Sequence, residues 1–216
     1  MKLSFKLNNV TTETLGFHLN PNFSIQAPQP KTYLVEIPFS SHVIDLTESF
    51  GEVAYQQRQV NFTLEKLRPK DTWYQDYSNF VNQYNGRLVQ LVAPYDDGYY
   101  FKGRVSVAPM RRGDHLSFDV SVLCEPYRYK QYETVVNLTV TTGGTLSTVL
   151  INSRKKVIPT ITVSASTQVV FGDTSTTISA GTHTLTNIVL VEGNNSLTFN
   201  AANGTTITIT YQEGEL

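Results

Sequence analysis

An alternation of apolar and polar residues with a period of two runs through most of the chain, and it constrains the fold more than any other feature. Val60, Phe62 and Leu64 alternate with polar residues, and residues 1–8 and 117–127 show the same period. A strand that buries one face and exposes the other to water produces this pattern. The chain is therefore predicted to be mainly β.

One segment, from Asp71 to Gly86, departs from this period. Its apolar and aromatic side chains recur at three- and four-residue spacing, as on one face of an amphipathic helix of about four turns. These side chains are Trp73, Tyr74, Tyr77, Phe80, Val81 and Tyr84. We predict Asp71 as the N-cap and Asn85-Gly86 as the end of the only sizeable helix. The rings are predicted to pack on a sheet, and a sugar-stacking platform is the alternative.

Extended segments and turns account for the rest of the first half. Residues 21–31 form a proline-rich loop, and residues 33–40 are predicted to resume extended structure. Residues 87–93 and 99–108 are predicted to pair as a hairpin, because Pro, Asp and Gly lie between them. Residues 110–114 are predicted to form another turn.

The composition changes after Pro126 and Tyr127. From there on, short Thr-, Val- and Ile-rich segments are separated by Gly or Asn, which is typical of an antiparallel β-sandwich. We predict two domains. The first is β-sandwich-like with one α-helix over residues 1–130, and the second is an antiparallel β-sandwich over residues 131–216.

The net charge of −1 at pH 7 gives no overall attraction to nucleic acid or to an anionic membrane. The charge is nevertheless uneven, because all 17 Lys and Arg residues lie at or before Lys156. Residues 1–156 carry a net charge of +3 and residues 157–216 carry −4. This asymmetry suggests two surfaces with different functions.

The single cysteine, Cys124, excludes an intramolecular disulfide, and its place in an alternating run predicts a buried, unreactive thiol. Residues 1–16 contain no apolar stretch long enough for a signal peptide. No segment approaches the roughly 20 apolar residues of a membrane span. We expect the chain to be made and folded in the cytosol.

Residues with metal-binding potential are scattered along the chain. The four histidines have no other His or Cys at the spacing of zinc ligands. They are His18, His42, His115 and His183. Asp96 and Asp97 form an acidic pair, but their position between Pro and Gly favours a hairpin turn over a metal site.

Two further motifs have structural interpretations. Ser153 to Lys156 matches the Ser-x-x-Lys pattern of penicillin-recognising enzymes, but the companion motifs are absent. The basic group Arg104, Arg111 and Arg112 is more typical of a solvated turn than of a nucleic-acid site. No GxSxG, P-loop or GxGxxG motif occurs. The protein is therefore predicted not to be an enzyme, with no catalytic, metal-binding or cofactor-binding residue, and the sequence assigns no interface residue.

Four segments occur in an order that resembles a known family. They are the strand 53–67, the helix 72–86 ending in Asn-Gly, the hairpin segment 99–108 and the strand 117–129 with its Cys-x-Pro-Tyr ending. The C-terminal part agrees with a Pro-initiated strand, a Leu-rich strand ending in Gly-Asn, and a final Tyr-Gln-Glu-Gly-x-Leu. Over nearly its whole length the chain resembles the distal tail protein, Dit, of siphophages that infect Gram-positive bacteria.

The resemblance implies an N-terminal domain that closes with its copies into a six-fold ring around the tail channel, through which DNA passes. It implies a galectin-like C-terminal sandwich outside this ring. The implied partners are other copies of the chain in a homohexamer, the tail tube protein, the tail-associated lysin or hub protein, and receptor-binding proteins. The implied location is the virion tail tip, without membrane insertion. The second domain has no room for an inserted carbohydrate-binding module, so it is predicted to be a docking platform.

Three other classes remain as alternatives. A carbohydrate-binding adhesin would use Trp73 for sugar binding. A tail-tube or tube-completion protein usually has one sandwich with a long loop, and the compact second domain after Pro126 argues against it. A tail-tip enzyme comes last, because no nucleophile or acid–base pair is evident.

Overall fold

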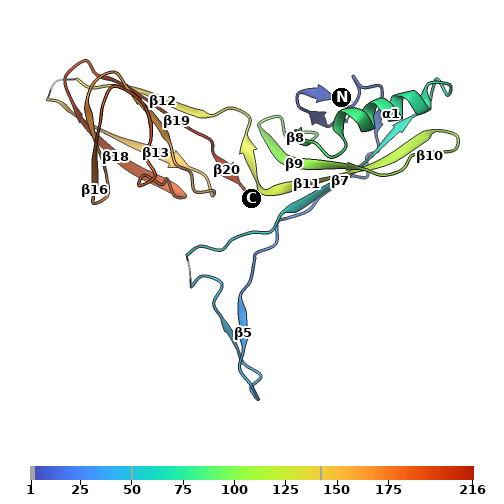
Figure 1. Ribbon diagram of the computed structural model, residues 1–216, viewed down its shortest axis with the longest axis horizontal. Coiled ribbons are helices and arrows are strands. Elements are labelled where there is room, and N and C mark those ends of the chain that lie inside the picture. Colours follow the sequence, from blue (N-terminus) through green and yellow to red (C-terminus); the bar gives the residue numbers. More distant parts are fainter. Residues whose placement is uncertain (1–2, 50, 142) are drawn as a thin grey trace. The chain divides into compact units, whose positions relative to one another are not determined.

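The computed structural model describes residues 3–49, 51–141 and 143–216. The chain divides into two compact units, an N-terminal unit of residues 1–128 and a C-terminal unit of residues 129–215 (Figure 1). The domain ranges 1–130 and 131–216 stay predictions.

The N-terminal unit is built around one curled sheet. Its strands lie in the order β2-β1-β8-β9-β11-β7-β3, with β10 also paired to β11 and β4 to β7. β5 and β6 form a separate two-stranded sheet. The strand bounds are β1 (Lys6–Leu7), β2 (Val10–Thr11), β3 (His18–Leu19), β4 (Ser24–Ile25), β5 (Leu34–Glu36), β6 (Val43–Asp45), β7 (Arg58–Lys66), β8 (Leu88–Val92), β9 (Tyr99–Val107), β10 (Arg111–Arg112) and β11 (Leu116–Lys130), whose last two residues belong to the C-terminal unit.

The alternating runs of the sequence become the inward faces of β7 and β11, as predicted. The two strands pair antiparallel, with Phe62 opposite Val120 and Leu64 opposite Phe118. These four side chains are buried. Residues on one face of a strand pair lie close enough to pack, so the period of two read from the sequence is a direct record of this core.

The helix α1 (Trp73–Tyr84) is the one α-helix among the described residues. Its N-cap residue is Thr72, so the prediction of Asp71 is wrong. Thr72 Oγ1 donates to Asp76 Oδ2 at 2.7 Å instead of capping the backbone, and Lys66 Nζ of β7 donates to the same oxygen at 2.6 Å. A contact with the sheet therefore fixes the first turn, and local cap signals do not encode such a contact.

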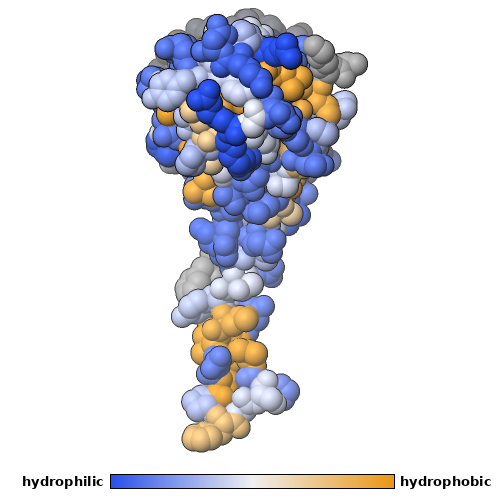
Figure 2. Space-filling model, turned by 90° about the vertical axis from the view of Figure 1, so that its right-hand side faces the viewer, coloured by the Kyte–Doolittle hydropathy of each residue, from blue (hydrophilic) through white to orange (hydrophobic). Residues whose placement is uncertain are grey.

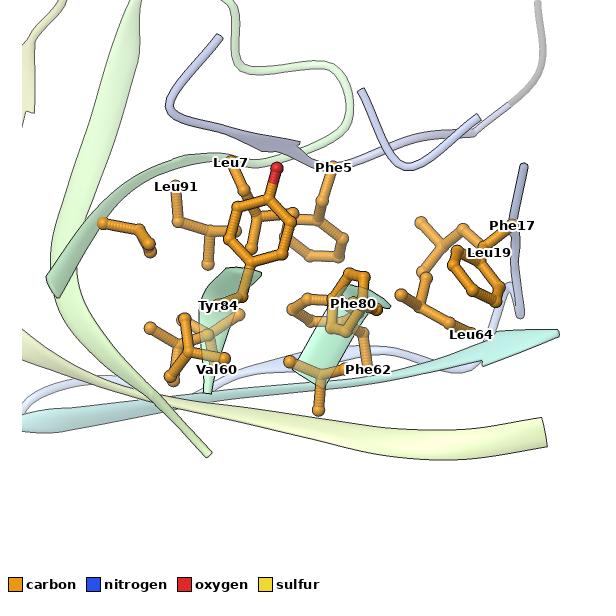
Figure 3. Close-up of a cluster of buried hydrophobic side chains, with 14 of the residues drawn as sticks. Phe5, Leu7, Phe17, Leu19, Val60, Phe62, Leu64, Phe80, Tyr84 and Leu91 are labelled. Atoms are coloured by element: carbon orange, nitrogen blue, oxygen red, sulfur yellow. The ribbon is translucent and has the colours of Figure 1, made fainter. Parts of the chain in front are cut away.

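Aromatic rings connect the helix to the sheet in the core of the N-terminal unit (Figure 3). The ring centroid of Phe80 lies 5.2 Å from that of Phe118 and 5.6 Å from that of Phe17. Phe5 stacks on Phe62 at 4.3 Å. Offset and edge-to-face pairs of this kind add about 0.5–1.5 kcal/mol each beyond the apolar area they bury.

Most of the predicted helix face packs on the sheet. Trp73 and Tyr84 are buried, and Tyr77 and Val81 are half-buried. Tyr74 is 67% exposed, so its inclusion in the packed face is wrong. Consecutive helical residues point about 100° apart, and the turn that places Trp73 in the core directs Tyr74 to solvent.

Several predicted boundaries differ from the structure, although the elements exist. The strand expected at 1–8 is confined to Lys6–Leu7 within the described residues, and the strand expected at 53–67 begins only at Arg58. The expected turn at 110–114 contains the short strand β10. Gly86 has a φ of +75°, the left-handed conformation predicted for the end of the helix.

The C-terminal unit consists of two four-stranded antiparallel sheets, as predicted. Their strand orders are β12-β19-β14-β17 and β13-β18-β15-β16. Along β19 the side chains alternate. Ile207 and Ile209 point into the core, and the threonines at 206, 208 and 210 point outward. The strands of these sheets are β12 (Thr134–Thr139), β13 (Thr145–Asn152), β14 (Thr160–Val163), β15 (Thr167–Phe171), β16 (Thr174–Ile178), β17 (Gly181–Thr184), β18 (Gly193–Ala201) and β19 (Thr206–Tyr211). The short strand β20 (Gly214–Glu215) lies outside them and pairs with β11.

Among the described residues, no helix has the length and apolar character needed to cross a membrane.

Candidate functional site: an exposed apolar hairpin

The N-terminal unit carries a hairpin that pairs only with itself (Figure 1). β5 and β6 are antiparallel, with Val35 opposite Ile44 and Glu36 opposite Val43. The extension is closed at its base, where the amide of Lys31 donates to the carbonyl of Ala54 at 2.8 Å. The hairpin therefore has a defined register but no covering layer among the described residues.

One face of this hairpin is apolar except for His42, which alternation along β6 puts on the same side as Ile44. Cross-strand partners share a face, so Val35 and Ile44 lie on the same side, and alternation along the strands adds Tyr33 and Ile37 to it. We call these four residues the apolar face of the hairpin. Their exposed fractions are 59% for Tyr33, 36% for Val35, 39% for Ile37 and 46% for Ile44. In Figure 2 the extension at the bottom of the view shows hydrophobic, orange patches among hydrophilic ones.

The opposite face of the hairpin is mixed. Leu34 and Val43 are exposed on it together with Glu36 and Asp45. At the tip, Phe39 is fully exposed and has a φ of +62°, which is uncommon for a bulky residue. The two faces therefore differ in the amount of apolar surface that a partner could cover.

A two-stranded hairpin is at best marginally stable in water unless its hydrophobic face packs on something. Contiguous apolar surface of this kind on a soluble protein marks a binding site. The hairpin would therefore be stabilised by another surface that packs on its apolar face. Sequence reasoning treated 33–40 only as extended structure, because an apolar run reads the same whether the core or a partner covers it.

The side chains that could bind a metal ion or take part in catalysis do not form a cluster among the described residues. Among the described residues, no group of three or more His, Cys, Asp and Glu side chains could hold a metal ion. Asp96 and Asp97 lie in the turn between β8 and β9, as predicted, and their carboxylates bond to different cations. Asp96 accepts from Arg128 at 2.8 Å, and Asp97 accepts from Lys6 at 2.7 Å.

The histidines do not converge with these acids. His18 and His42 are exposed, and His115 is half-buried. His183 Nε2 lies 2.8 Å from the carbonyl oxygen of Ser179. Each is therefore an ordinary strand or loop residue in the structure.

The basic group is split between structural contacts. Arg111 binds Asp119 through two hydrogen bonds of 2.6 and 2.9 Å, and Thr63 Oγ1 donates to the same carboxylate at 2.7 Å. The Arg111 and Thr63 bonds lower the pKa of Asp119 to about 2. Arg104 donates to the carbonyl of Gly86. These contacts give Arg104 and Arg111 structural partners within the N-terminal unit.

Two other candidates are also structural. Trp73 is 2% exposed, so this ring is not available for sugar stacking of the kind an adhesin would need. Cys124 is buried in the core as predicted, and burial raises the pKa of its thiol to about 12. A thiol with this pKa is protonated at neutral pH and is a poor nucleophile.

Sequence comparisons find no relative: no protein-family model and no curated protein matches the chain. Structural comparison does find similar folds. The crystal structure of SPP1 Dit (gp 19.1), described as a paradigm of the hub adsorption apparatus in Gram-positive infecting phages, matches with a TM-score of 0.69. The match covers 100% of both chains at 14% sequence identity.

The chain has the Dit fold. Full coverage means that both units, and not a single common sandwich, take part in the match. In this chain the Dit fold presents the hairpin β5–β6 in the N-terminal unit and the charge-poor strands 157–216 in the C-terminal unit.

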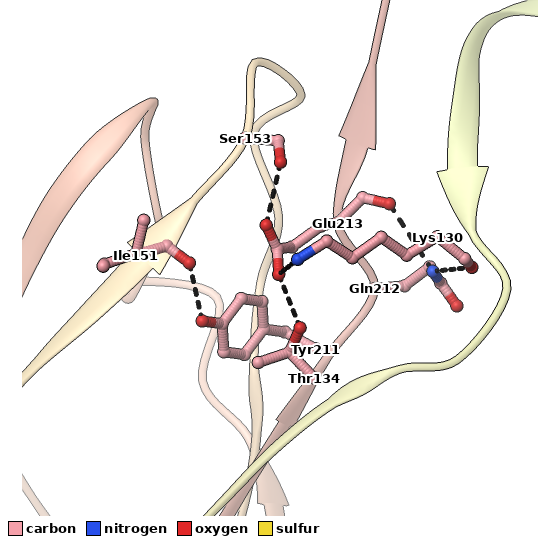
Figure 4. A network of polar contacts seen from close by, with 7 residues as sticks. All are labelled: Lys130, Thr134, Ile151, Ser153, Tyr211, Gln212 and Glu213. Carbon is pink, nitrogen blue, oxygen red and sulfur yellow. Dashed lines mark hydrogen bonds and ion pairs between the residues drawn. The ribbon is translucent and has the colours of Figure 1, made fainter. Parts of the chain in front are cut away.

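A buried carboxylate, that of Glu213, organises one end of the C-terminal unit (Figure 4). It accepts hydrogen bonds from Lys130 Nζ, Thr134 Oγ1 and Ser153 Oγ. Ser153 is thus bound to an acid. Burial by itself would raise the pKa of Glu213, but the three hydrogen bonds and the charge of Lys130 outweigh it and lower the pKa. Sequence reasoning missed this group, because Glu213 is far along the chain from the three residues that donate to it.

Glu213→Gln is expected to lower the free energy of unfolding of the C-terminal unit by about 2 kcal/mol at pH 7, because Lys130 loses its charged partner. Differential scanning calorimetry should show the loss as a lower transition temperature for this unit. Glu133→Gln is the matched control, since Glu133 is exposed, and it is expected to change stability by less than about 0.5 kcal/mol.

The difference between wild type and Glu213→Gln should depend on pH. A folded pKa below the ordinary 4.5 means that the contribution is complete above pH 4.5 and is lost as pH falls through the folded pKa. A difference that stays constant from pH 7 to strongly acid pH would contradict this role for the Glu213 carboxylate.

Proposed function

We propose that this chain is a structural protein of a phage tail tip: a distal tail protein that forms a hexameric ring and joins the tail tube to the adsorption apparatus. The observation that carries the proposal is an uncovered apolar hairpin in a chain whose whole length has the fold of a phage hub protein. A ring supplies what the hairpin lacks, which is a neighbouring surface.

The contact would be heterologous, with the hairpin of one copy on a different surface of the next. Such contacts close into a ring only when the rotation between neighbours divides a full turn. The apolar face, formed by Tyr33, Val35, Ile37 and Ile44, would be buried in this contact. The mixed face with Glu36 and Asp45 would stay toward water, because burying unpaired carboxylates is costly.

The proposed ring would surround the channel through which DNA passes. Its proposed partners are the tail tube protein on one side and the tail-associated lysin or hub protein on the other. The C-terminal unit would lie outside the ring as a docking platform for receptor-binding proteins. The proposed location is therefore the tail tip of the virion.

A structural role also agrees with how the reactive side chains are used. The acids Asp96, Asp97 and Glu213 are each bound to a cation, and Ser153 is bound to Glu213. Groups held in this way stabilise a fold and are unsuited to act as nucleophiles or bases. A non-enzymatic role is the one these contacts support.

Size-exclusion chromatography with light scattering tests the ring directly. The chain mass is 24.2 kDa, so a hexamer is expected near 145 kDa, and a back-to-back pair of rings at twice that mass. Negative-stain images should show particles with a central hole. A strict monomer at high micromolar concentration, with no ring in the images, would refute the proposal.

A further inference from the structure

The C-terminal unit has an open sheet edge at β13, the outermost strand of β13-β18-β15-β16. β13 pairs with β18 over eight consecutive residues, from Thr145 opposite Asn200 to Asn152 opposite Gly193, without a bulge. At about 3.4 Å per residue this edge is about 27 Å long. It is the longest edge strand of the two sheets.

The register shows which backbone groups of β13 point away from the sheet. The amide of Ala201 donates to the carbonyl of Gly144 at 2.9 Å, so residue 144 belongs to a hydrogen-bonded pair. In an antiparallel ladder such pairs alternate with pairs whose N–H and C=O groups point outward. Thr145, Ser147 and Val149 therefore direct their backbone groups to the open edge.

These outward groups are uncovered over most of the strand. Within the described residues, the backbone N–H and C=O of Thr145, Ser147 and Val149 have no hydrogen-bond partner on the open side. Only the last position is closed, because Tyr211 Oη donates to the carbonyl of Ile151 at 2.7 Å. The free stretch offers donors and acceptors at the spacing of a β-strand.

β13 also lacks the features that usually protect an edge. Its sequence TLSTVLIN contains no charged residue and no proline. Natural edge strands are blunted by lysine, proline, bulges or short length. On β13 the side chains that would flank an added strand include Val149 and Ile151, which are 54% and 66% exposed.

From these observations we infer that β13 is a docking edge for an extended segment of a partner protein, which adds a strand to the sheet through main-chain hydrogen bonds. The inference deepens the proposed role of the C-terminal unit as a docking platform and rests on it. The segment is uncharged and carries apolar side chains at alternate positions, which cover Val149 and Ile151.

An extended segment fits this edge better than a second folded copy. Stable interfaces between globular proteins bury at least about 1,200 Å², and a single strand edge is too narrow to supply that area between two rigid sandwiches. A flexible segment instead gains several main-chain bonds along one line. A ring would present several copies of the β13 edge, and a partner with several such segments would bind with a higher apparent affinity through avidity.

The test uses the full chain with the hairpin substitutions Val35→Ser and Ile44→Ser, and a short synthetic peptide in which threonine and valine alternate. Amide hydrogen exchange is followed by NMR. Millimolar peptide is expected to slow exchange of the Ser147 and Val149 amides at least tenfold. Absence of this protection would overturn the inference.

Ser147→Pro removes one outward N–H and leaves the β18 ladder intact, so it is expected to abolish protection by the peptide. Ser147→Ala is the matched control: both variants lose the hydroxyl contact of Ser147 with Thr198, and only proline removes the donor. Val149→Lys serves as a second blocking variant that keeps the N–H but adds a charge. Equal protection of the proline and alanine variants would also contradict a docking edge.

Two outcomes separate this inference from the ring. A dimer of the hairpin-substituted chain that disappears with Ser147→Pro would assign the edge to a second copy and overturn the inference. A wild-type chain that forms rings but shows no peptide protection would leave the proposed function standing and remove only the docking edge.

Discussion

Replacing both Val35 and Ile44 with serine is expected to convert the proposed hexameric ring into monomers. These side chains face each other across the hairpin and are the centre of its apolar face. Burying each would contribute about 1.5–3 kcal/mol to a contact between copies. Losing both weakens each contact by about 100-fold or more, and a closed ring depends on all its contacts. Light scattering should show a mass near 24.2 kDa at micromolar concentration.

The control for this experiment lies on the other face of the same hairpin. Leu34→Ser with Val43→Ser also removes two apolar side chains, and it leaves Val35 and Ile44 in place. This variant is expected to retain the ring. Trp73, the single tryptophan, is buried in the N-terminal unit and should keep the same fluorescence in both variants if the fold is intact. Equal dissociation of both variants would show that the contact does not depend on the apolar face.

Gly103→Ala is expected to destabilise the N-terminal unit by about 3 kcal/mol. Gly103 lies in β9 against β11, where a Cβ would meet Cys124 Sγ at 2.7 Å, the Leu123 carbonyl oxygen at 2.7 Å and Cys124 Cα at 2.9 Å. Two of these atoms belong to the backbone, so the strands themselves must move apart. Urea unfolding followed by Trp73 fluorescence reports this unit alone, because its ring lies in that core.

Gly98→Ala, just before β9, is the matched control for Gly103→Ala. Gly98 has no heavy atom within 4 Å of a built Cβ and no positive φ, so its substitution is expected to change stability by less than about 0.5 kcal/mol. Combining Gly103→Ala with Cys124→Ala should restore only part of the loss, since the carbonyl of Leu123 remains in place. An unchanged urea midpoint for Gly103→Ala would contradict this close packing of β9 on β11.

Much of the fold could be read from the sequence because its signals are local. Val60, Phe62 and Leu64 alternate because one face of β7 is buried, and the spacing from Trp73 to Tyr84 follows the pitch of a helix. Such periodicity reports which side of an element is apolar. The two sheets of the C-terminal unit followed from the same reasoning applied to its Thr-rich strands.

The candidate site could not be read in the same way. Tyr33, Val35 and Ile37 form an apolar run whose sequence is equally suited to a core strand, and only the structure leaves it uncovered. Asp71 was a plausible cap by composition, but the contact between Lys66 and Asp76 sets the start of the helix elsewhere. These outcomes depend on residues brought together from different elements.

The sequence by itself determined that this chain is a mainly β protein with one helix, because backbone geometry imposes a period on each element wherever a core lies on one side. Tertiary structure decided which apolar surfaces that core covers and which stay open, on β5–β6 and along the edge of β13. The physical reason is that burial is a property of pairs of surfaces, and a linear pattern records only one member of each pair.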